Sequence, residues 1–168
     1  MEDLVMINHE FWLNKKVLIT GHTGFKGSWL TMLLSILGAK VYGLSLEVLP
    51  KPSLYEEINN SKSLCEDFFV DINNSGKLSR CILDINPEIV FHLAAQPLVR
   101  ESYKKPINTW STNLMGSLNL LDGLMNLKRF CAVVMITTDK VYKNKEWIYG
   151  YRENDQLGGY DPYSASKA

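Results

Sequence analysis

A glycine-rich turn near the N-terminus constrains the fold of this chain more than any other feature. Gly21, Gly24 and Gly27 lie between a short apolar run, residues 16–20, and a segment with leucines at helical spacing, residues 28–37. A strand, a three-glycine turn and a helix in this order are typical of a dinucleotide-binding unit. The first glycine permits the tight turn, the second lets the backbone approach a pyrophosphate, and the third allows close helix–sheet packing. This placement disfavours the alternative, a glycine-rich turn without a ligand.

Predicted strands and helices alternate along the rest of the chain. We expect strands at residues 39–46, 67–70, 88–93 and 131–137, and helices at residues 76–85 and 108–127, the last with Leu114, Leu118, Leu121 and Leu124 on one face. This alternation predicts an α/β fold, a doubly wound parallel sheet of the Rossmann type. Residues 143–160 are polar and glycine-rich, which indicates a surface loop. A final helix begins at Pro162 and is cut at Ala168, so we expect a domain truncated before a C-terminal substrate domain.

Length, composition and charge are those of one soluble domain, residues 1–168. The 168 residues are 46% hydrophobic, and 18 basic residues balance 18 acidic residues. No basic surface is therefore expected for nucleic acid, and no apolar run is long enough to cross a membrane. The acidic residues 1–3 lack the basic start of a secretory signal. Three cysteines without CxxC spacing favour reduced cytoplasmic thiols over disulfides or a zinc site, and we expect no metal.

Candidate cofactor-binding residues cluster at the carboxyl ends of the predicted strands, where open α/β sheets bind their ligands. The predicted set is Gly21, Thr23, Gly24, Phe25, Gly27, Asp71, Ile72, Leu93, Ala94, Ala95, Tyr163 and Lys167. Asp71 either accepts a hydrogen bond from the adenine amino group or caps a strand end or helix. Ser45 stands where an acidic ribose-binding residue is expected, and no arginine replaces it. The choice between NAD and NADP is open, with NAD favoured.

Candidate catalytic residues lie in two short segments near the C-terminus. Tyr163 and Lys167 are four residues apart, on one face of the final helix. A tyrosine titrates at pH ~10 in water, and a nearby ammonium stabilises its phenolate and makes it a better base. Such pairs are common on helix surfaces, so the significance of this one depends on the glycine turn upstream. Asp139 and Lys140 directly follow a predicted strand, and a solvated loop edge is the alternative for them. His92 is expected to be structural.

Four segments together resemble the CDP-glucose 4,6-dehydratase family, a branch of the extended short-chain dehydrogenase/reductases. They are residues 21–30 (GHTGFKGSWL), 92–103 (HLAAQPLVRESY), 138–142 (TDKVY) and 151–168 (YRENDQLGGYDPYSASKA). Lys140 distinguishes this family from its relatives, because related dehydratases acting on dTDP- or GDP-sugars usually carry glutamate there. The resemblance implies NAD as the cofactor, CDP-glucose as the substrate and a homodimer in the complete protein. It also implies chains roughly twice this long, whose C-terminal half holds the nucleotide base.

The resemblance further implies a mechanism. Tyr163, with Lys167 and Thr138, removes the proton of the glucose C4 hydroxyl while hydride passes to NAD. Lys140 then removes the C5 proton, Asp139 protonates the departing C6 hydroxyl, and hydride returns to C6 to give CDP-4-keto-6-deoxyglucose. Two alternatives stay open: another nucleotide-sugar epimerase or dehydratase of the same group, and a non-catalytic nucleotide-binding fragment. An epimerase does not need the Asp139–Lys140 pair for elimination.

Overall fold

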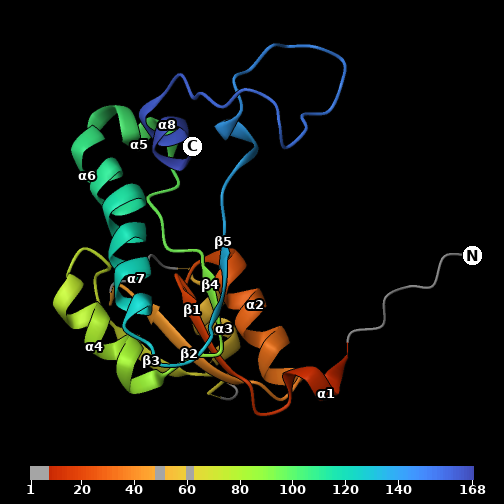
Figure 1. Ribbon diagram of the computed structural model, residues 1–168, viewed down its shortest axis with the longest axis vertical. Helices are drawn as coiled ribbons and strands as arrows, with labels where there is room; N and C mark the ends of the chain where they lie inside the picture. Colours follow the sequence, from red (N-terminus) through yellow and green to blue (C-terminus); the bar gives the residue numbers. More distant parts are fainter. Residues whose placement is uncertain (1–7, 48–51, 60–62) are drawn as a thin grey trace, which may run out of the picture.

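A five-stranded parallel sheet forms the centre of the structure, a computed structural model that describes residues 8–47, 52–59 and 63–168 (Figure 1). Its strands are β1 (Lys16–Thr20), β2 (Lys40–Ser45), β3 (Glu66–Phe69), β4 (Ile89–His92) and β5 (Ala132–Met135). They lie in the order β3-β2-β1-β4-β5, and every neighbouring pair is parallel. The predicted doubly wound Rossmann-type sheet is therefore confirmed. The order reverses between β1 and β4, which is where such sheets bind their ligands.

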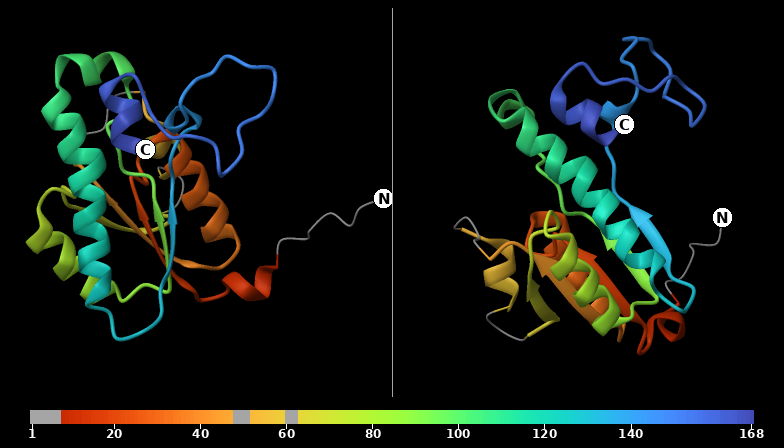
Figure 2. Two further views of the ribbon diagram at one scale, coloured as in Figure 1. Left: turned by 45° about the horizontal axis from the view of Figure 1, so that its top comes forward. Right: turned by 60° about the vertical axis from the view of Figure 1, so that its left-hand side comes forward.

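Helices cover both faces of this sheet. The helices of the described residues are α1 (His9–Trp12), α2 (Phe25–Ile36), α3 (Leu54–Asn59), α4 (Ser75–Ile85), α5 (Val99–Lys104), α6 (Pro106–Trp110), α7 (Gly116–Met125) and α8 (Pro162–Lys167), with a π-helical segment η1 (Ser111–Met115) and a 3₁₀ turn η2 (Asp139–Val141). Helices α2, α4 and α7 cover the two faces, and α5, α6 and α8 lie beyond the strand ends (Figure 1, Figure 2). In the described ranges, no helix is both long and apolar enough to span a bilayer. The acidic residues 1–3 lie outside the described residues. The three cysteines form no disulfide.

The long predicted helix and the first predicted helix both differ in detail from the structure. Residues 106–125 form one helical rod, but its middle is the π segment η1, which no periodicity indicated. Helix α2 begins at Phe25, three residues earlier than predicted, so Gly27 belongs to the helix and not to the turn. A Cβ atom at Gly27 would overlap the carbonyl oxygen of Gly21. The glycine therefore serves close packing inside the first helical turn.

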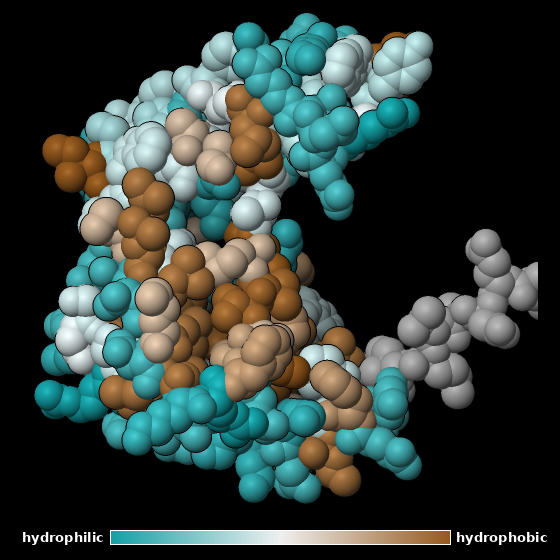
Figure 3. Space-filling model, viewed as in Figure 1, coloured by the Kyte–Doolittle hydropathy of each residue, from teal (hydrophilic) through white to brown (hydrophobic). Residues whose placement is uncertain are grey.

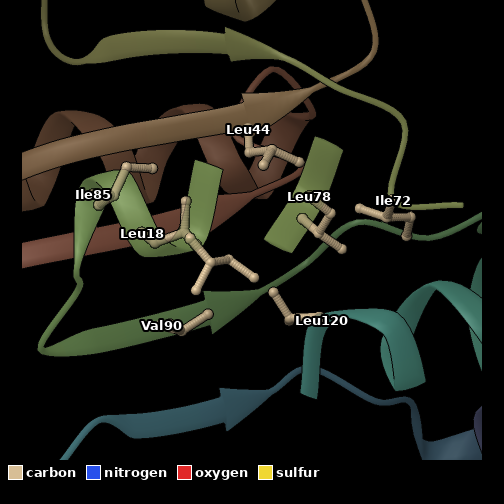
Figure 4. Close-up of a cluster of buried hydrophobic side chains, with 8 residues drawn as sticks. Leu18, Leu44, Ile72, Leu78, Ile85, Val90 and Leu120 are labelled. Atoms are coloured by element: carbon tan, nitrogen blue, oxygen red, sulfur yellow. The ribbon is translucent and has the colours of Figure 1, made fainter. Parts of the chain in front are cut away.

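Figure 2 shows α2 on one face of the sheet and α4 and α7 on the other. A buried cluster of side chains lies on each face. On the α4–α7 face, Leu18, Leu44 and Val90 of the strands pack with residues that include Leu78 and Leu120 of the helices (Figure 4). On the α2 face, the cluster consists of Val17, Ile19, Leu34, Leu37, Val41 and Ile89. Neighbouring residues of β1 point to opposite faces, so this central strand is buried on both sides. Each fully buried aliphatic side chain contributes about 1.5–3 kcal/mol to stability.

Helix α7 turns its glycine face, rather than its leucine face, toward the core. Gly116 and Gly123 lie so close to α4 and the preceding loop that a Cβ atom would meet Ile72 or Ile82, and Leu120 beside them is fully buried. Three of the four predicted leucines are on the other side: Leu114, Leu118 and Leu121 are 41%, 47% and 38% exposed. Leu124, the fourth, is partly buried against the core cluster. The leucine spacing indicated a helix, while the close approach of its backbone to α4 decided which face is buried.

Candidate functional site

A cavity of about 830 Å³ opens at the carboxyl ends of the strands. Its walls come from the turns that follow β1 to β5 and from helix α8, which lies beyond the strand ends beside α5 and α6 (Figure 1). Every predicted cofactor-binding residue lines it: Gly21, Thr23, Gly24, Phe25, Gly27, Asp71, Ile72, Leu93, Ala94, Ala95, Tyr163 and Lys167. The volume is in the range of small-molecule and cofactor sites. The structure thus brings the set together, and the binding roles stay predictions.

The glycine turn forms one wall of the cavity and needs glycine for two reasons. Gly21 has φ +73°, and its N–H donates to the Leu44 carbonyl at 2.7 Å. A Cβ atom at Gly21 would also lie 2.8 Å from the backbone nitrogen of Ala94. Gly24 is the N-cap residue of α2 and provides no side-chain hydrogen bond. The first N–H groups of α2 and its positive dipole end therefore lie at the cavity wall, which favours an anion such as a pyrophosphate.

The end of the cavity beside β2 and β3 lacks the expected ribose-binding acid. Ser45 ends β2, and its hydroxyl donates to the carbonyl of Leu46 at 3.1 Å. Asp71 lines the cavity, but its Oδ1 accepts from both the backbone and the side chain of Asn73, at 2.9 and 3.1 Å. Asn74, and not Asp71, caps helix α4. Asp71 is thus a turn residue whose carboxylate is partly engaged, and contact with adenine stays a prediction for it.

His92 ends β4 and is a fully buried structural residue, as expected. Its Nδ1 lies 2.6 Å from the hydroxyl of Thr20, and its Nε2 lies 2.9 Å from the hydroxyl of Ser117. Ser117 donates its own proton to the Asn113 carbonyl at 2.6 Å, so it must accept from Nε2–H, and Nδ1 then accepts from Thr20. Burial and the charge of Lys167 lower the pKa of His92 to about 4. The imidazole is therefore neutral with a defined tautomer.

Asn113, in the π segment, connects this buried network to helix α8. Its Oδ1 accepts from the backbone N–H of Gln96 at 2.8 Å, and its Nδ2 donates to the Gln96 carbonyl at 3.2 Å and to the Ser166 hydroxyl at 2.8 Å. Ser166 in turn donates to the Tyr163 carbonyl at 2.8 Å. Only 3% of Asn113 is exposed, so these hydrogen bonds are shielded from water. They fix the helix that carries Tyr163 relative to the loop after β4.

The Tyr163–Lys167 pair faces the cavity from helix α8. Asp161 caps this helix by accepting from the N–H of Ser164 at 2.9 Å, and Pro162 occupies its first turn. Both side chains line the cavity, and burial lowers the pKa of Lys167. A partly desolvated ammonium interacts more strongly with a neighbouring anion than one in water, so Lys167 is suited to stabilise a phenolate at Tyr163.

The other predicted catalytic residues, Thr138, Asp139 and Lys140, do not line this cavity. They form the start of η2, where the Thr138 hydroxyl donates to Asp139 at 3.0 Å and accepts from the backbone N–H of Lys140 at 3.3 Å. Asp139 and Lys140 are exposed. Segment η2 packs against α8, and the charge of Lys140 helps to lower the pKa of Asp161, against the effect of burial. The structure thus places the three residues beside the Tyr163–Lys167 helix and outside the cavity.

Sequence reasoning missed the residues that position the site rather than line it. Asn113 and Ser166 connect α8 to Gln96, which itself lines the cavity, and neither of the two was singled out. One signal was available, because an asparagine within an apolar helical run is unfavourable unless its side chain has a specific partner. Nothing local indicated the partner, which is 53 residues away along the chain.

The parallel sheet, the glycine turn at its strand ends and the Tyr163–Lys167 pair on α8 are the features of a Rossmann-type domain of the extended short-chain dehydrogenase/reductases. Residues 18–168 match the family described as GDP-mannose 4,6 dehydratase, and the chain belongs to this family.

Comparison with known proteins places the chain close to sugar-nucleotide dehydratases and epimerases. It is 52% identical over 162 residues to a CDP-glucose 4,6-dehydratase from Salmonella typhimurium, covering 96% of this chain and 45% of that protein. It is 30% identical over 169 residues to a CDP-paratose 2-epimerase from Salmonella typhi, covering 90% of this chain and 49% of the relative. A UDP-glucose 4-epimerase from Thermus thermophilus in complex with NAD superposes with a TM-score of 0.76 and 28% identity, covering 90% of this chain and 47% of that one. The chain spans about half the length of these relatives.

Proposed function

We propose that this protein is an NAD-dependent sugar-nucleotide 4,6-dehydratase that acts on CDP-glucose. The observation that carries the proposal is the 52% identity to a CDP-glucose 4,6-dehydratase over 96% of the chain. The cavity supports it, because all residues predicted to contact a dinucleotide line one space of about 830 Å³. Three free thiols accord with the cytoplasm, where we place the protein.

The residues around the cavity fit NAD. Gly24 leaves open the approach to the N-terminus of α2, where backbone N–H groups would hold the pyrophosphate. Ala94 and Ala95, after β4, have side chains small enough for a nicotinamide ribose to approach the backbone. Lys167 lies across the cavity and would donate to the same ribose. When bound, NAD supplies the hydride acceptor for oxidation at C4 and the hydride donor at C6.

The chain's own residues supply the proton transfers of the proposed reaction. Tyr163 Oη takes the proton of the C4 hydroxyl, and the Lys167 ammonium stabilises the resulting phenolate. Oxidation at C4 gives a ketone, which acidifies the proton on C5. Lys140, as a neutral amine, takes that proton, and Asp139 protonates the C6 hydroxyl, which leaves as water. Lys140 then returns its proton to C5 as hydride reaches C6. Thr138 assists at C4 once its hydroxyl turns away from Asp139, to which it donates in the structure.

The exposure of Asp139 and Lys140 is consistent with these roles, because a sugar must reach both side chains from beside α8. Segment η2 packs against α8. The proposal therefore needs the sugar to lie across the boundary between the cavity and η2, with its C4 near Tyr163.

An epimerase of the same group is the second candidate function. The similarity to a CDP-paratose 2-epimerase and to a UDP-glucose 4-epimerase favours it, since these proteins share the fold. An epimerisation conserves the mass of the sugar nucleotide, whereas the dehydration loses one water. A nucleotide-binding module without catalysis is the third candidate, and it would bind NAD without changing any sugar nucleotide.

One experiment separates these three candidates. The chain is titrated with NAD and NADP by calorimetry and then incubated with NAD and CDP-glucose, and the nucleotide sugar is analysed by mass spectrometry. We expect saturable NAD binding and loss of one water. A product of unchanged mass would indicate an epimerase. Because this chain spans about half the length of its relatives, turnover is measured in a chain extended to their full length, and NAD binding without turnover there would indicate a binding module. Lys140→Met should retain NAD binding and abolish dehydration, so dehydration by that variant would contradict the role of Lys140.

A further inference from the structure

Four polar side chains lie close together beside the glycine turn and outside the cofactor cavity. His22 comes from the turn itself, Tyr55 from α3, and Cys65 and Asp67 from the start of β3. His22 is fully buried, and Tyr55 is 7% exposed. One donor atom from each of His22, Cys65 and Asp67 lies within 4.8 Å of the other two. None of the four lines the cavity.

The carboxylate of Asp67 is the centre of this cluster. Its Oδ1 lies 2.9 Å from Nε2 of His22, 2.6 Å from the hydroxyl of Tyr55 and 3.2 Å from Sγ of Cys65. A single oxygen thus faces three donor groups, while Oδ2 accepts from Tyr55, also at 2.6 Å. Within the described residues, no lysine or arginine forms an ion pair with Asp67. The negative charge has only neutral partners there.

The fold makes this convergence specific. Cys65 and Asp67 are two residues apart at the start of a strand, so their side chains point to the same side. Gly43 of β2 pairs directly with Asp67, and a Cβ atom at Gly43 would overlap the imidazole of His22. The glycine therefore leaves the space in which His22 reaches the carboxylate. The sequence spacing of these residues matches no zinc motif, which is why composition and spacing argued against a metal.

We propose that His22, Cys65 and Asp67 form a binding site for Zn²⁺. Imidazole nitrogen, thiolate sulfur and carboxylate oxygen are the ligands that Zn²⁺ takes in proteins. His22 provides Nε2, Cys65 provides Sγ, and Asp67 provides Oδ1. Tyr55 keeps its hydrogen bond to Oδ2 and orients the carboxylate, as hydrogen bonds to metal ligands do. Water, entering beside the partly exposed Asp67, completes four-fold coordination.

The distances in the cluster are close to those of such a site. Zinc bond lengths and tetrahedral angles place ligand nitrogen and oxygen about 3.4 Å apart, and ligand sulfur and oxygen about 3.6 Å apart. The corresponding separations are 2.9 Å and 3.2 Å. Each pair must open by about half an ångström, which is within reach of side-chain rotation. The zinc ion then replaces the direct contacts of His22 and Cys65 with Oδ1 of Asp67.

The charges also balance. A divalent ion with one thiolate, one carboxylate and a neutral imidazole gives a complex without net charge, which is the form that burial favours. Burial lowers the pKa of His22, so its imidazole is neutral and available as a ligand. Burial and the adjacent Asp67 raise the pKa of Cys65 to about 12, so binding releases the thiol proton. The ion would join the glycine turn to β3 and stabilise the folded chain by mass action.

Cobalt(II) tests this site, because a thiolate ligand gives a sulfur-to-cobalt charge-transfer band and tetrahedral coordination gives intense visible bands. The reduced, metal-free chain without an affinity tag is titrated with Co²⁺ and then with Zn²⁺. We expect one equivalent of Co²⁺ to produce both bands and one equivalent of Zn²⁺ to remove them. Zn²⁺ should also raise the melting temperature, and a chelator should reverse this shift.

Cysteine variants assign the band. The double variant Cys81→Ser/Cys131→Ser retains only Cys65 and leaves the cluster untouched, so it should keep the full spectrum. Cys65→Ser should lose the charge-transfer band, and Asp67→Asn should bind Co²⁺ at least tenfold more weakly. Far-UV circular dichroism of each metal-free variant establishes that it is folded. The proposal is wrong if the natural chain gives no charge-transfer band, or if the double variant loses it.

Discussion

At the scale of single residues, the three glycines of the turn differ in what a side chain would meet. A Cβ atom at Gly21 or Gly27 would contact backbone at less than 3 Å, so substitution there disrupts the turn itself. At Gly24 the nearest atom would be the carbonyl oxygen of Gly21, at 3.3 Å, and the φ of −73° suits any residue. Gly24 can therefore be changed with the fold kept, which separates binding from stability.

Gly24→Ala is expected to change the free energy of unfolding by less than about 1 kcal/mol. It should weaken NAD binding at least about tenfold, because the added methyl group occupies the space through which the pyrophosphate approaches the backbone. Gly76→Ala is the matched control, because the nearest atom to its Cβ would be 4.0 Å away. In helix α4 that change should stabilise by about 0.5–1 kcal/mol and leave NAD binding unchanged. Calorimetric titration and urea denaturation measure the two effects. Equal NAD affinity in both variants would contradict the proposal that the pyrophosphate approaches the backbone at Gly24.

His92 makes stability depend on pH. Its pKa of about 4 in the folded chain lies below the ordinary value of 6.5, so the unfolded chain binds more protons between these values. Stability is complete above pH ~6.5 and falls as the pH decreases toward ~4, by about 3 kcal/mol in total. Between pH ~7 and pH ~5 we expect a loss of about 2 kcal/mol from this residue. The buried His22 adds to the loss in the same direction.

Urea denaturation at the two pH values measures this loss. His92→Gln cannot titrate, so its stability should change less between the two pH values than that of the natural chain. His9→Gln, on the exposed helix α1, should keep the full pH dependence. An unchanged pH dependence in His92→Gln would show that His92 is not the group responsible.

At the scale of elements, the π segment η1 is the feature that joins the two halves of the site. Asn113 lies in it and makes three hydrogen bonds to Gln96 and Ser166. Asn113→Ala should destabilise the chain by about 2–4 kcal/mol, because it leaves buried partners unsatisfied. Amide hydrogen exchange of residues 162–167 should also become faster. Asn126→Ala, which removes one exposed bond to the Asp122 carbonyl, should change neither quantity. Unaltered exchange in Asn113→Ala would mean that α8 is held by packing alone.

The individual elements also show which parts of the fold could be predicted from the sequence. Strand β1, helix α4 and the glycine turn were predictable because their apolar spacing and their caps are local. Helices α1, α3 and α5 have only 4 to 6 residues each and carry too little periodicity to be found. The π segment has no periodicity that indicates it, and the partners of its Asn113 are distant in the chain. The residues of the cavity could be predicted because the topology places strand ends together, whereas the His22–Asp67 contact depends on the space left by Gly43.

At the scale of the whole molecule, the surface is more apolar than the balanced composition indicated. Figure 3 shows hydrophobic residues gathered across one face, over α2 and β5. Trp29, Leu33 and Ile36 form a row on α2 and are 48%, 43% and 65% exposed, and Val134 of the edge strand β5 is 42% exposed. Periodicity predicted that α2 has an apolar face. It could not show that apolar residues extend beyond the area that the sheet covers.

An apolar face beside the edge strand β5, which pairs on one side only within the described residues, and a net charge of zero predict self-association of the 168-residue chain. Sedimentation velocity should show species that grow with protein concentration near neutral pH. Ile36→Lys should weaken this association at least about tenfold, the effect of removing one aliphatic side chain from an interface, without loss of stability. The matched control is Ile148→Lys, because Ile148 is 93% exposed and lies in the loop between η2 and α8. If both variants associate as the natural chain does, the surface over α2 is not the contact. If both dissociate, added charge alone is the cause, and the apolar face carries no specific role in association.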